Sequence, residues 1–407
     1  TVEADNIFHN IGCICNGYIT TQLCQVIPND IPAIIVSAGP SLNKNIDHLK
    51  NAKNKAFIVA VDTALKPLVM HGIIPDIYVI VDGKKPVTLL DFDEARRIPL
   101  MTSLSASKDV LKNHHDKKFF FNEGITIVNN LFAMNRIPFY SVACGGSVAC
   151  SAFSLVYKMG FSRIILVGQD LALTGNKTHA DGTFMDKMQT IDTSNAIMVE
   201  GNYEKEVPTR ADFKMYLDWF NYYIAGCEGI HVINATEGGA RIQNTEQMLL
   251  KDAIERECTK EIDIDACFDK LQPIFDQEAR KKAIDYLNEI PLMFAKLRKE
   301  VLKEKNHYKK LEQICKQPVV DRTAYLRTLE RIKKSTQKLE RHELYGIITS
   351  TLALADYMIM SEQYYEEETL KDEGLEISRK GIKYLELVDR CITILKSLAE
   401  NTVGELK

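Results

Sequence analysis

Short apolar runs alternate with amphipathic stretches between about residues 31 and 235, and this alternation restricts the fold more than any other feature. Runs rich in β-branched residues are typical of strands, and apolar residues spaced by three and four are typical of helices. We expect strands at Ala33–Ser37, Ala56–Val61, Ile77–Val81, Lys118–Phe121, Arg163–Val167 and His231–Asn234, with helices at Asn43–Asn51, Ala64–Gly72 and Val148–Gly160 between them. The pattern predicts an α/β fold with a mainly parallel sheet covered on both faces.

The sequence after about residue 245 is rich in Lys, Glu and Leu and has the amphipathic helix period. The periodic apolar positions are Leu287, Phe294, Leu297, Val301, Ile382, Leu385, Val388, Ile392 and Leu395. We expect an α-helical C-terminal domain, an antiparallel bundle interrupted at Pro291, Pro318 and Gly374. The predicted domains are an N-terminal extension at 1–30, an α/β core at 31–250 and a helical domain at 251–407. The helices could bind a protein partner, although a self-contained bundle core explains the same spacing.

Composition excludes several functional classes. A net charge of −4 and a pI near 6.2 argue against binding to nucleic acid or to an anionic membrane. No apolar run is long enough to cross a bilayer, and no signal peptide begins the sequence, so we expect no membrane insertion. The ten cysteines include no Cys-x-x-Cys, which favours reduced, mostly buried thiols and a cytoplasmic location.

The stretch "IPAIIVSAGPSLNKNI" joins an apolar strand to a helix through a Gly-Pro-Ser turn. The first amides of a helix lack partners and attract anions, so the turn predicts a phosphate site. There Gly39 allows close backbone approach, Pro40 stiffens the loop, and Ser41 caps the helix or donates to phosphate. A tight turn without a ligand explains the residues equally well. No P-loop motif follows. Asp62, after the next strand, lies near the place where a dinucleotide site has an acid, but the Gly-x-Gly-x-x-Gly glycines are missing, so a nucleotide is favoured over a dinucleotide.

A second stretch, residues 143–182, holds another set of polar residues beside predicted strand and helix ends. The run Gly145-Gly146-Ser147 precedes an apolar helix and could supply further anion-facing amides. Acidic residues follow three of the strands: Asp62, Asp82 and Asp170. Ligands of open α/β sheets bind outside the carboxyl ends of the strands, so these acids predict a site on one rim. Each acid taken alone could instead cap a helix or order a loop.

One histidine can be placed near this rim. His179 lies in the polar loop Thr178-His179-Ala180-Asp181-Gly182, a short distance after Asp170. The pKa of an imidazole near neutrality suits it to general-base catalysis. A histidine of an ordinary surface loop would look the same.

Four motifs, taken in order, resemble those of the motility-associated factor (Maf) family of flagellin glycosyltransferases. They are "VSAGPSL", "VAVDTALKPL", "PDIYVIVDG" and "GGSVACSAF…LVGQDLALTGNKTHADG", and the resemblance covers roughly residues 25–250. The central domain of that family belongs to a group named after an archaeal hydroxymethylpterin pyrophosphokinase. Its core is similar to the family 42 sialyltransferases, a Rossmann-like variant of the GT-A type.

The resemblance implies a cytoplasmic enzyme that transfers pseudaminic or legionaminic acid from a CMP-activated donor to Ser or Thr of flagellin, with inversion and without a metal. No tightly bound cofactor is implied. The nucleotide site would comprise Gly39, Pro40, Ser41, Asp62, Gly145, Gly146 and Ser147, to which the rim position adds Asp82, Gln169 and Thr178. We expect the catalytic residues to be His179 and Asp170.

Two features depart from the family pattern. The sialyltransferases place a catalytic histidine before the helix that reads "ADFKMYLDWF" here, and this sequence has "EVPTRADF" with no histidine. The base could therefore be His179, Asp170 or Asp181, or could come from elsewhere. Maf proteins also carry a sizeable N-terminal domain, whereas only residues 1–30 precede the core here, which indicates a short member or a trimmed chain.

Two other functions stay open at this point. A pterin pyrophosphokinase would need ATP and Mg²⁺, which the three rim acids could hold. A non-catalytic flagellin-binding chaperone or scaffold would use the helical domain and have no affinity for CMP.

Overall fold

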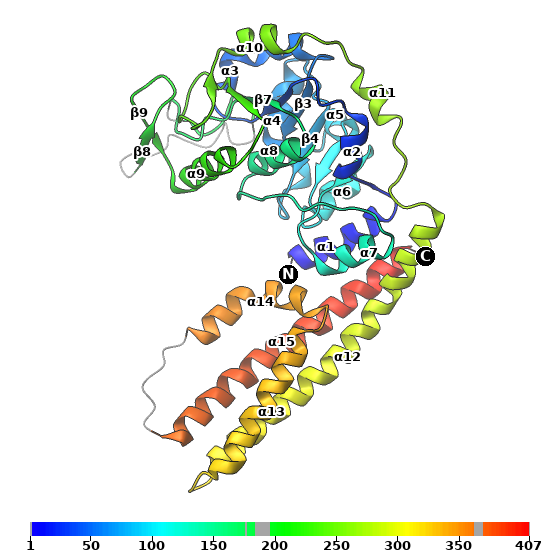
Figure 1. Ribbon diagram of the computed structural model, residues 1–407, viewed down its shortest axis with the longest axis vertical. Coiled ribbons are helices and arrows are strands. Elements are labelled where there is room, and N and C mark those ends of the chain that lie inside the picture. Colours follow the sequence, from blue (N-terminus) through cyan, green and yellow to red (C-terminus); the bar gives the residue numbers. More distant parts are fainter. Residues whose placement is uncertain (1, 176, 184–195, 362–368, 407) are drawn as a thin grey trace. The chain divides into compact units, whose positions relative to one another are not determined.

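The computed structural model describes residues 2–175, 177–183, 196–361 and 369–406 (Figure 1). The chain forms two compact units: an α/β unit of residues 16–123 and 138–274, and a helical unit of residues 1–15, 124–137 and 275–407. The predicted domain bounds of 1–30, 31–250 and 251–407 differ from this division. Two short segments, from the N-terminus and from the middle of the chain, group with the C-terminal helices.

The α/β unit is built on a nine-stranded sheet in which every pairing is parallel. Its order is β1 (Tyr18–Ile19), β6 (Lys118–Phe120), β5 (Leu100–Thr102), β4 (Ile77–Ile80), β3 (Phe57–Val61), β2 (Ala33–Val36), β7 (Arg163–Val167), β10 (His231–Asn234) and β11 (Glu246–Gln247). The predicted mainly parallel sheet is confirmed, and all six predicted strands are present to within one residue at each end. Strands β2, β3 and β4 are buried along their whole length, as expected for a sheet covered on both faces.

The sequence analysis missed the shorter strands. Strands β1 and β11 have two residues each and β5 has three. A separate antiparallel pair, β8 (Ile197–Glu200) and β9 (Glu206–Thr209), was also missed. Strands of two or three residues are too short to show a period, and β8 and β9 each contain exposed residues and so lack the continuous buried run of the central strands.

Helices of the α/β unit are α2 (Thr20–Val26), α3 (Leu42–Asn45), α4 (Asp62–Met70), α5 (Asp93–Arg97), α6 (Lys108–Asn113), α8 (Val148–Lys158), α9 (Ala211–Ala225), α10 (Leu250–Glu257) and α11 (Ile264–Phe268). Two 3-10 helices, η1 (Ile46–Ala52) and η2 (Val87–Leu89), accompany them. The predicted helix at Asn43–Asn51 is wrong in type: one turn of α3 is followed by η1. Helix α8 packs against β2, β3 and β4, and Figure 1 shows it beside the sheet.

The strand order reverses beside β2. From β2 the chain adds β3, β4, β5 and β6 on one side, and then returns to place β7 on the other. The carboxyl ends of β2 and β7 therefore lie at a topological switch point, from which the chain continues to opposite sides of the sheet and where open α/β sheets form their ligand crevice. The two strands remain bonded beyond their ends, since the amide of Ser37 donates to the carbonyl of Val167 at 2.8 Å.

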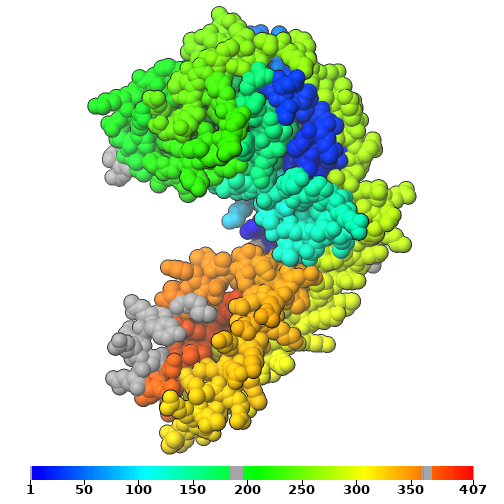
Figure 2. Space-filling view, viewed as in Figure 1, coloured from blue at the N-terminus to red at the C-terminus, as the bar shows by residue number. Residues whose placement is uncertain are grey.

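The helical unit contains α1 (Val2–Ile14), α7 (Thr126–Met134), α12 (Gln277–Cys315), α13 (Arg322–Glu340), α14 (Tyr345–Met360) and α15 (Leu370–Leu406). The predicted helical C-terminal region is confirmed. Two ion pairs, Arg298–Asp389 and Lys305–Glu386, show that α12 and α15 run antiparallel. In the space-filling view α14, in orange, lies at the surface of this unit (Figure 2).

Two of the three predicted interruptions of the bundle are wrong. Pro318 does fall between α12 and α13, but Pro291 lies inside α12 and Gly374 inside α15. A Cβ on Gly374 would lie 2.3 Å from the Sγ of Cys315 and 2.7 Å from the ring of Tyr325. The glycine is needed for close packing of helices, so it does not mark a helix end.

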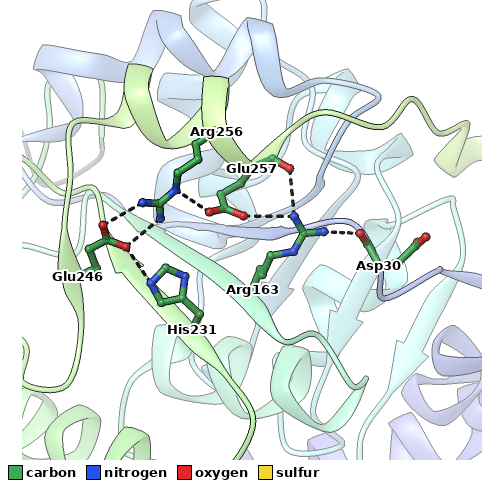
Figure 3. Close-up of polar contacts among 6 residues, drawn as sticks. All are labelled: Asp30, Arg163, His231, Glu246, Arg256 and Glu257. Carbon is green, nitrogen blue, oxygen red and sulfur yellow. Dashed lines mark hydrogen bonds and ion pairs between the residues drawn. The ribbon is translucent and has the colours of Figure 1, made fainter.

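Charged side chains link the amino ends of β7 and β10 to α10 (Figure 3). Arg163, the first residue of β7, binds Glu257 at 3.2 Å and the carbonyl of Asp30. Arg256 binds both Glu257, at 2.7 Å, and Glu246, which also binds His231 at 2.8 Å. The network lies at the amino ends of the strands. It therefore stabilises the end of the sheet that is opposite the predicted site.

The ten cysteines are all free thiols, as predicted, and six of them are buried. Across the described part of the chain, no helix combines the length and apolarity that crossing a membrane requires.

Candidate functional site

The Gly-Pro-Ser turn at the end of β2 already holds an anion, the carboxylate of Asp170. The Ser41 hydroxyl donates to Oδ2 of Asp170 at 2.6 Å, and the Ser41 amide donates to the same carboxylate at 3.2 and 3.3 Å. Ser41 is 0% exposed and Asp170 is 2% exposed. The sequence predicted that this turn would bind the phosphate of a ligand. In the structure its place is taken by the carboxylate of Asp170, which follows β7 at the switch point.

Glycine is required at position 39 by this same contact. A Cβ there would lie 2.0 Å from Oδ2 of Asp170 and 2.5 Å from the carbonyl oxygen of Gly168. The Gly39 amide donates to that carbonyl at 2.7 Å. The predicted close approach of backbone to an anion is thus present, and the anion is a protein side chain.

Burial raises the pKa of the Asp170 carboxyl, while hydrogen bonds from Ser41 and Thr174 and the charge of Lys44 oppose that rise. Thr174 donates to Oδ1 at 2.8 Å, so both carboxylate oxygens accept from hydroxyl groups. Next to it, Gln169 is also buried and accepts from the Ser37 hydroxyl at 2.5 Å. With both oxygens engaged and almost no exposed surface, Asp170 holds the turn in place.

The two other rim acids have different environments. Asp62, the first residue of α4, pairs through Oδ2 with the ammonium of Lys85 at 2.6 Å, and their side chains are 2% and 12% exposed. Asp82 is exposed, and its carboxylate accepts from the amide of Lys84 at 2.8 Å. Asp62 thus fixes a nearly buried cation on the rim, whereas Asp82 orders the loop that carries that cation.

The side chain of His179 lies in the electrostatic field of two cations, Arg210 and Lys85. Burial lowers its pKa, and the charges of Arg210 and Lys85 lower it further. Its Nδ1 is 2.9 Å from the hydroxyl oxygen of Thr178. The next residue, Ala180, donates its amide to the carbonyl of Ala38 at 2.8 Å, which ties this loop to the end of β2. The imidazole therefore stands on the rim with its pKa held below the ordinary value, in the field of two positive charges.

Arg210 precedes α9 and is positioned from two sides. Its Nε donates to Oδ1 of Asp212 at 2.9 Å, and its guanidinium lies over the ring of Phe213, 4.3 Å from the centroid. The planar fork of a guanidinium suits it to bind phosphate or carboxylate groups. Arg210 stands in the "EVPTRADF" segment, directly before the first residue of α9.

The predicted second glycine turn, before α8, lies along α9. A Cβ on Gly145 would lie 2.5 Å from the ring of Trp219, and Gly146, at φ +85°, packs against Tyr216. The hydroxyl of Ser147 accepts from the Cys150 amide at 3.2 Å and so caps α8. Packing against α9 and capping account for the residue types at this turn.

Sequence reasoning missed Lys85 and Arg210. The signal for Lys85 was the Lys84-Lys85 pair, which follows the rim residue Asp82 after one glycine. The signal for Arg210 was a cation in the segment "EVPTRADF", directly before the helix that follows it. Among the described residues, no group of three or more His, Cys, Asp or Glu side chains is arranged to hold a metal ion.

The chain is similar to one protein-family model and to solved protein structures. Residues 5–176, less than half of the chain, match the family model described as "6-hydroxymethylpterin diphosphokinase MptE-like". No curated protein sequence matches the chain.

A solved structure described as the Maf glycosyltransferase from Magnetospirillum magneticum AMB-1 matches with a TM-score of 0.61 and 15% sequence identity. The match covers 99% of this chain and 61% of that protein, so this chain spans less than two thirds of its length. Residues 5–176 therefore carry a domain of the MptE-like type, and the chain as a whole has the fold of the Maf glycosyltransferase.

Proposed function

We propose that this chain is a glycosyltransferase that moves a nonulosonic acid, pseudaminic or legionaminic, from a CMP-activated donor to a Ser or Thr hydroxyl of flagellin. The observation that carries the proposal is the placement of the His179 loop on the carboxyl rim, where the Ala180 amide bonds to the carbonyl of Ala38 at the end of β2. The charges of Lys85 and Arg210 lower the pKa of the imidazole there. The fold shared with the Maf glycosyltransferase supports the reaction class. The four sequence motifs support the donor and acceptor.

The reaction needs one base and a stabilised leaving group. The acceptor oxygen attacks the anomeric carbon of the sugar acid, its C–O bond forms as the bond to the CMP phosphate breaks, and the phosphate leaves with the electron pair. Lys85 and Arg210 offset the charge that grows on the phosphate. His179 takes the proton of the acceptor hydroxyl. A single displacement of this kind inverts the anomeric centre.

The environment of each group suits its role. A His179 Nδ1–H that donates to Thr178 leaves the Nε2 lone pair free to accept a proton. The ion pair with Asp62 holds the Lys85 ammonium in one place, so little reorganisation is needed when a phosphate arrives. Asp170 acts here as a positioning residue, because it holds the turn of Gly39–Ser41, which directly follows Ala38, the residue to which the His179 loop is bonded.

The family model favours a second candidate, a pterin diphosphokinase that transfers diphosphate from ATP. Such an enzyme would use the same rim but would select ATP with Mg²⁺ over CMP. The two candidates differ in nucleotide, so one titration separates them.

The test is a calorimetric and thermal-shift titration with CMP, CDP, UDP, ATP and NAD, the ATP arm with and without Mg²⁺. We expect a CMP-selective response that weakens about tenfold in Arg210→Met, the change expected from losing one charge-assisted contact. Arg327→Met, an exposed arginine of α13, is the matched control and should bind CMP normally. His179→Ala should keep CMP binding and lose transfer from a CMP-nonulosonate to flagellin.

Three results would overturn the proposal. Selectivity for ATP with Mg²⁺ would favour the diphosphokinase. No response to any of the five nucleotides would favour the scaffold reading. Normal transfer by His179→Ala would remove His179 from the mechanism.

A further inference from the structure

The core of the helical unit encloses a carboxyl group, that of Glu304 in α12. Helix α12 packs along α13 and α15, and Figure 1 shows the three side by side. Glu304 is 2% exposed, and within the part of the chain that the structure describes it forms no ion pair. Glu300, one turn earlier in the same helix, does form one, with Lys338 of α13 at 2.8 Å. An unpaired charge is costly in a buried place, so a carboxyl group there is better accommodated with its proton.

The hydrogen bonds of this side chain suit a protonated carboxyl group. Oε1 of Glu304 lies 2.7 Å from the hydroxyl oxygen of Thr336, which itself lies 3.1 Å from the carbonyl oxygen of Ile332. The Thr336 hydroxyl has one proton and cannot donate fully to both of these oxygens. A proton on Oε1 resolves the conflict, because the carboxyl group then donates to Thr336 and Thr336 donates to Ile332. Oε2 is buried with no hydrogen-bond partner among the described residues, which a neutral carbonyl oxygen tolerates better than an anionic one.

The groups that face Glu304 from the four C-terminal helices would leave a negative charge there without compensation. In the described part of the chain they are Tyr308 of α12, Ser335, Thr336 and Glu340 of α13, Tyr345 of α14 and Tyr384 of α15. Burial raises the pKa of each of these tyrosines above its ordinary value of 10, so the phenols stay neutral near pH 7. Burial also raises the pKa of the Glu304 carboxyl group above its ordinary value of 4.5. Two hydroxyl groups of α13 oppose that rise, and the charge of Glu340 adds to it.

We propose that Glu304 is a pH-dependent switch of the helical unit: with its proton the side chain stays in the core, and without it the contact between α12 and α13 opens so that water reaches the carboxylate. The change acts at Thr336, because its hydroxyl group joins Glu304 to α13. The inference goes beyond the proposed function and is independent of it, because the helical unit contains no residue of the carboxyl rim.

The direction of the pH dependence follows from the two states. In the open, hydrated state Glu304 ionises near its ordinary pKa of 4.5, whereas the enclosed carboxyl group keeps its proton to a higher pH. The stabilisation of the closed state is therefore complete below pH 4.5 and is lost as the pH rises through the higher pKa of that state. The helical unit is accordingly tightest in acid and opens at Glu304 as the pH rises.

The test is amide hydrogen exchange of the whole chain, read by mass spectrometry in peptides of α12 and α13 from pH 4.5 upward. After correction for the intrinsic pH dependence of exchange, the opening constant around Glu304 and Thr336 should rise by up to about tenfold per pH unit and level off above the pKa of the closed state. Glu304→Gln should show a constant value, because the amide has the same shape and no proton to lose. Glu289→Gln, a change of an exposed glutamate in the same helix, is the matched control and should follow the wild-type protein.

A second measurement reads the proton on Glu304 directly and can be made on the wild-type protein alone. Protein labelled with ¹³C at the side-chain carboxyl groups of its glutamates is titrated by NMR. We expect one signal to titrate above the ordinary value of 4.5, at the pH where the opening constant levels off. Where Glu304→Gln folds, that signal should be absent from its spectrum.

Each of three results would defeat the inference. An opening constant of the wild-type protein that does not change with pH would show that there is no switch. An equal rise in Glu304→Gln would assign the pH dependence to another group. Glutamate signals that all titrate at or below 4.5 would show that Glu304 is ionised in the folded protein.

Discussion

The hydroxyl of Ser41 donates to Oδ2 of Asp170 at 2.6 Å, joining two residues that are 129 positions apart in the sequence. Ser41 follows β2 and Asp170 follows β7, so this bond joins the two segments that leave the sheet at its switch point. Both side chains are buried, and the carboxylate accepts from the backbone and side chain of Ser41 together. The turn predicted as a phosphate site is thus filled by a protein carboxylate, and the cations of the same rim, Lys85 and Arg210, are held in place by Asp62 and Asp212.

Ser41→Ala should lower the free energy of unfolding by about 2–3 kcal/mol, because it leaves a buried carboxylate with one donor fewer. The measurement is urea unfolding followed by the fluorescence of Trp219, the only tryptophan of the chain, which lies in the α/β unit. Ser162→Ala removes an exposed hydroxyl of the same unit and is the control, with an expected change below about 0.5 kcal/mol. A Ser41→Ala variant as stable as this control would contradict the role of the joint.

The pH dependence of transfer should follow His179. Burial and the charges of Arg210 and Lys85 lower its pKa below the ordinary value of 6.5, so the neutral base persists through pH 7 and is lost only at more acidic pH. The kcat/KM for the CMP donor, which reports free-enzyme groups, should therefore fall on the acid side with a midpoint below pH 6.5. A midpoint above 6.5 would contradict this assignment, as would the same acid limb in the residual activity of His179→Ala.

Gly145→Ala should destabilise the α/β unit by about 1–3 kcal/mol, since its Cβ would lie 2.5 Å from the ring of Trp219 and the ring cannot move freely within the packed aromatic cluster of α9. Gly226→Ala is the matched control, because its Cβ would meet nothing closer than 3.6 Å. Trp219 fluorescence reports both the unfolding midpoint and any displacement of the ring. Equal midpoints for the two variants would show that the Gly145 contact is not tight in solution.

Arg163→Met should lower the free energy of unfolding by about 1–2 kcal/mol, because it breaks a partly buried ion pair with Glu257 and a bond to the backbone at Asp30. Lys50→Met removes one partner of an exposed pair with Asp47 and should cost at most about 0.5 kcal/mol. Urea unfolding of both variants, again followed through Trp219, gives the comparison. A smaller effect for Arg163→Met than for Lys50→Met would show that the network at the amino ends of the strands adds nothing to stability.

Much of the α/β unit could be predicted because its central strands are buried on both faces. Such strands read as continuous β-branched runs, so β2, β3 and β7 were found almost to the residue. The two- and three-residue strands at the sheet edges carry no such signal. Pro291 and Gly374 misled the prediction for another reason: packing along the length of α12 and α15 outweighs a local preference to end a helix.

The order of strands and acids along the chain was enough to predict which residues lie on the carboxyl rim, because a parallel sheet brings all its carboxyl ends to one edge. What each rim residue contacts was decided only by the tertiary structure. Asp170 fills the Gly-Pro-Ser turn, and Lys85 and Arg210 come to His179 from separate segments. Local sequence determines where a strand ends and a turn begins. Contacts between residues more than a hundred positions apart depend on the strand order and on side-chain packing, which no local pattern encodes.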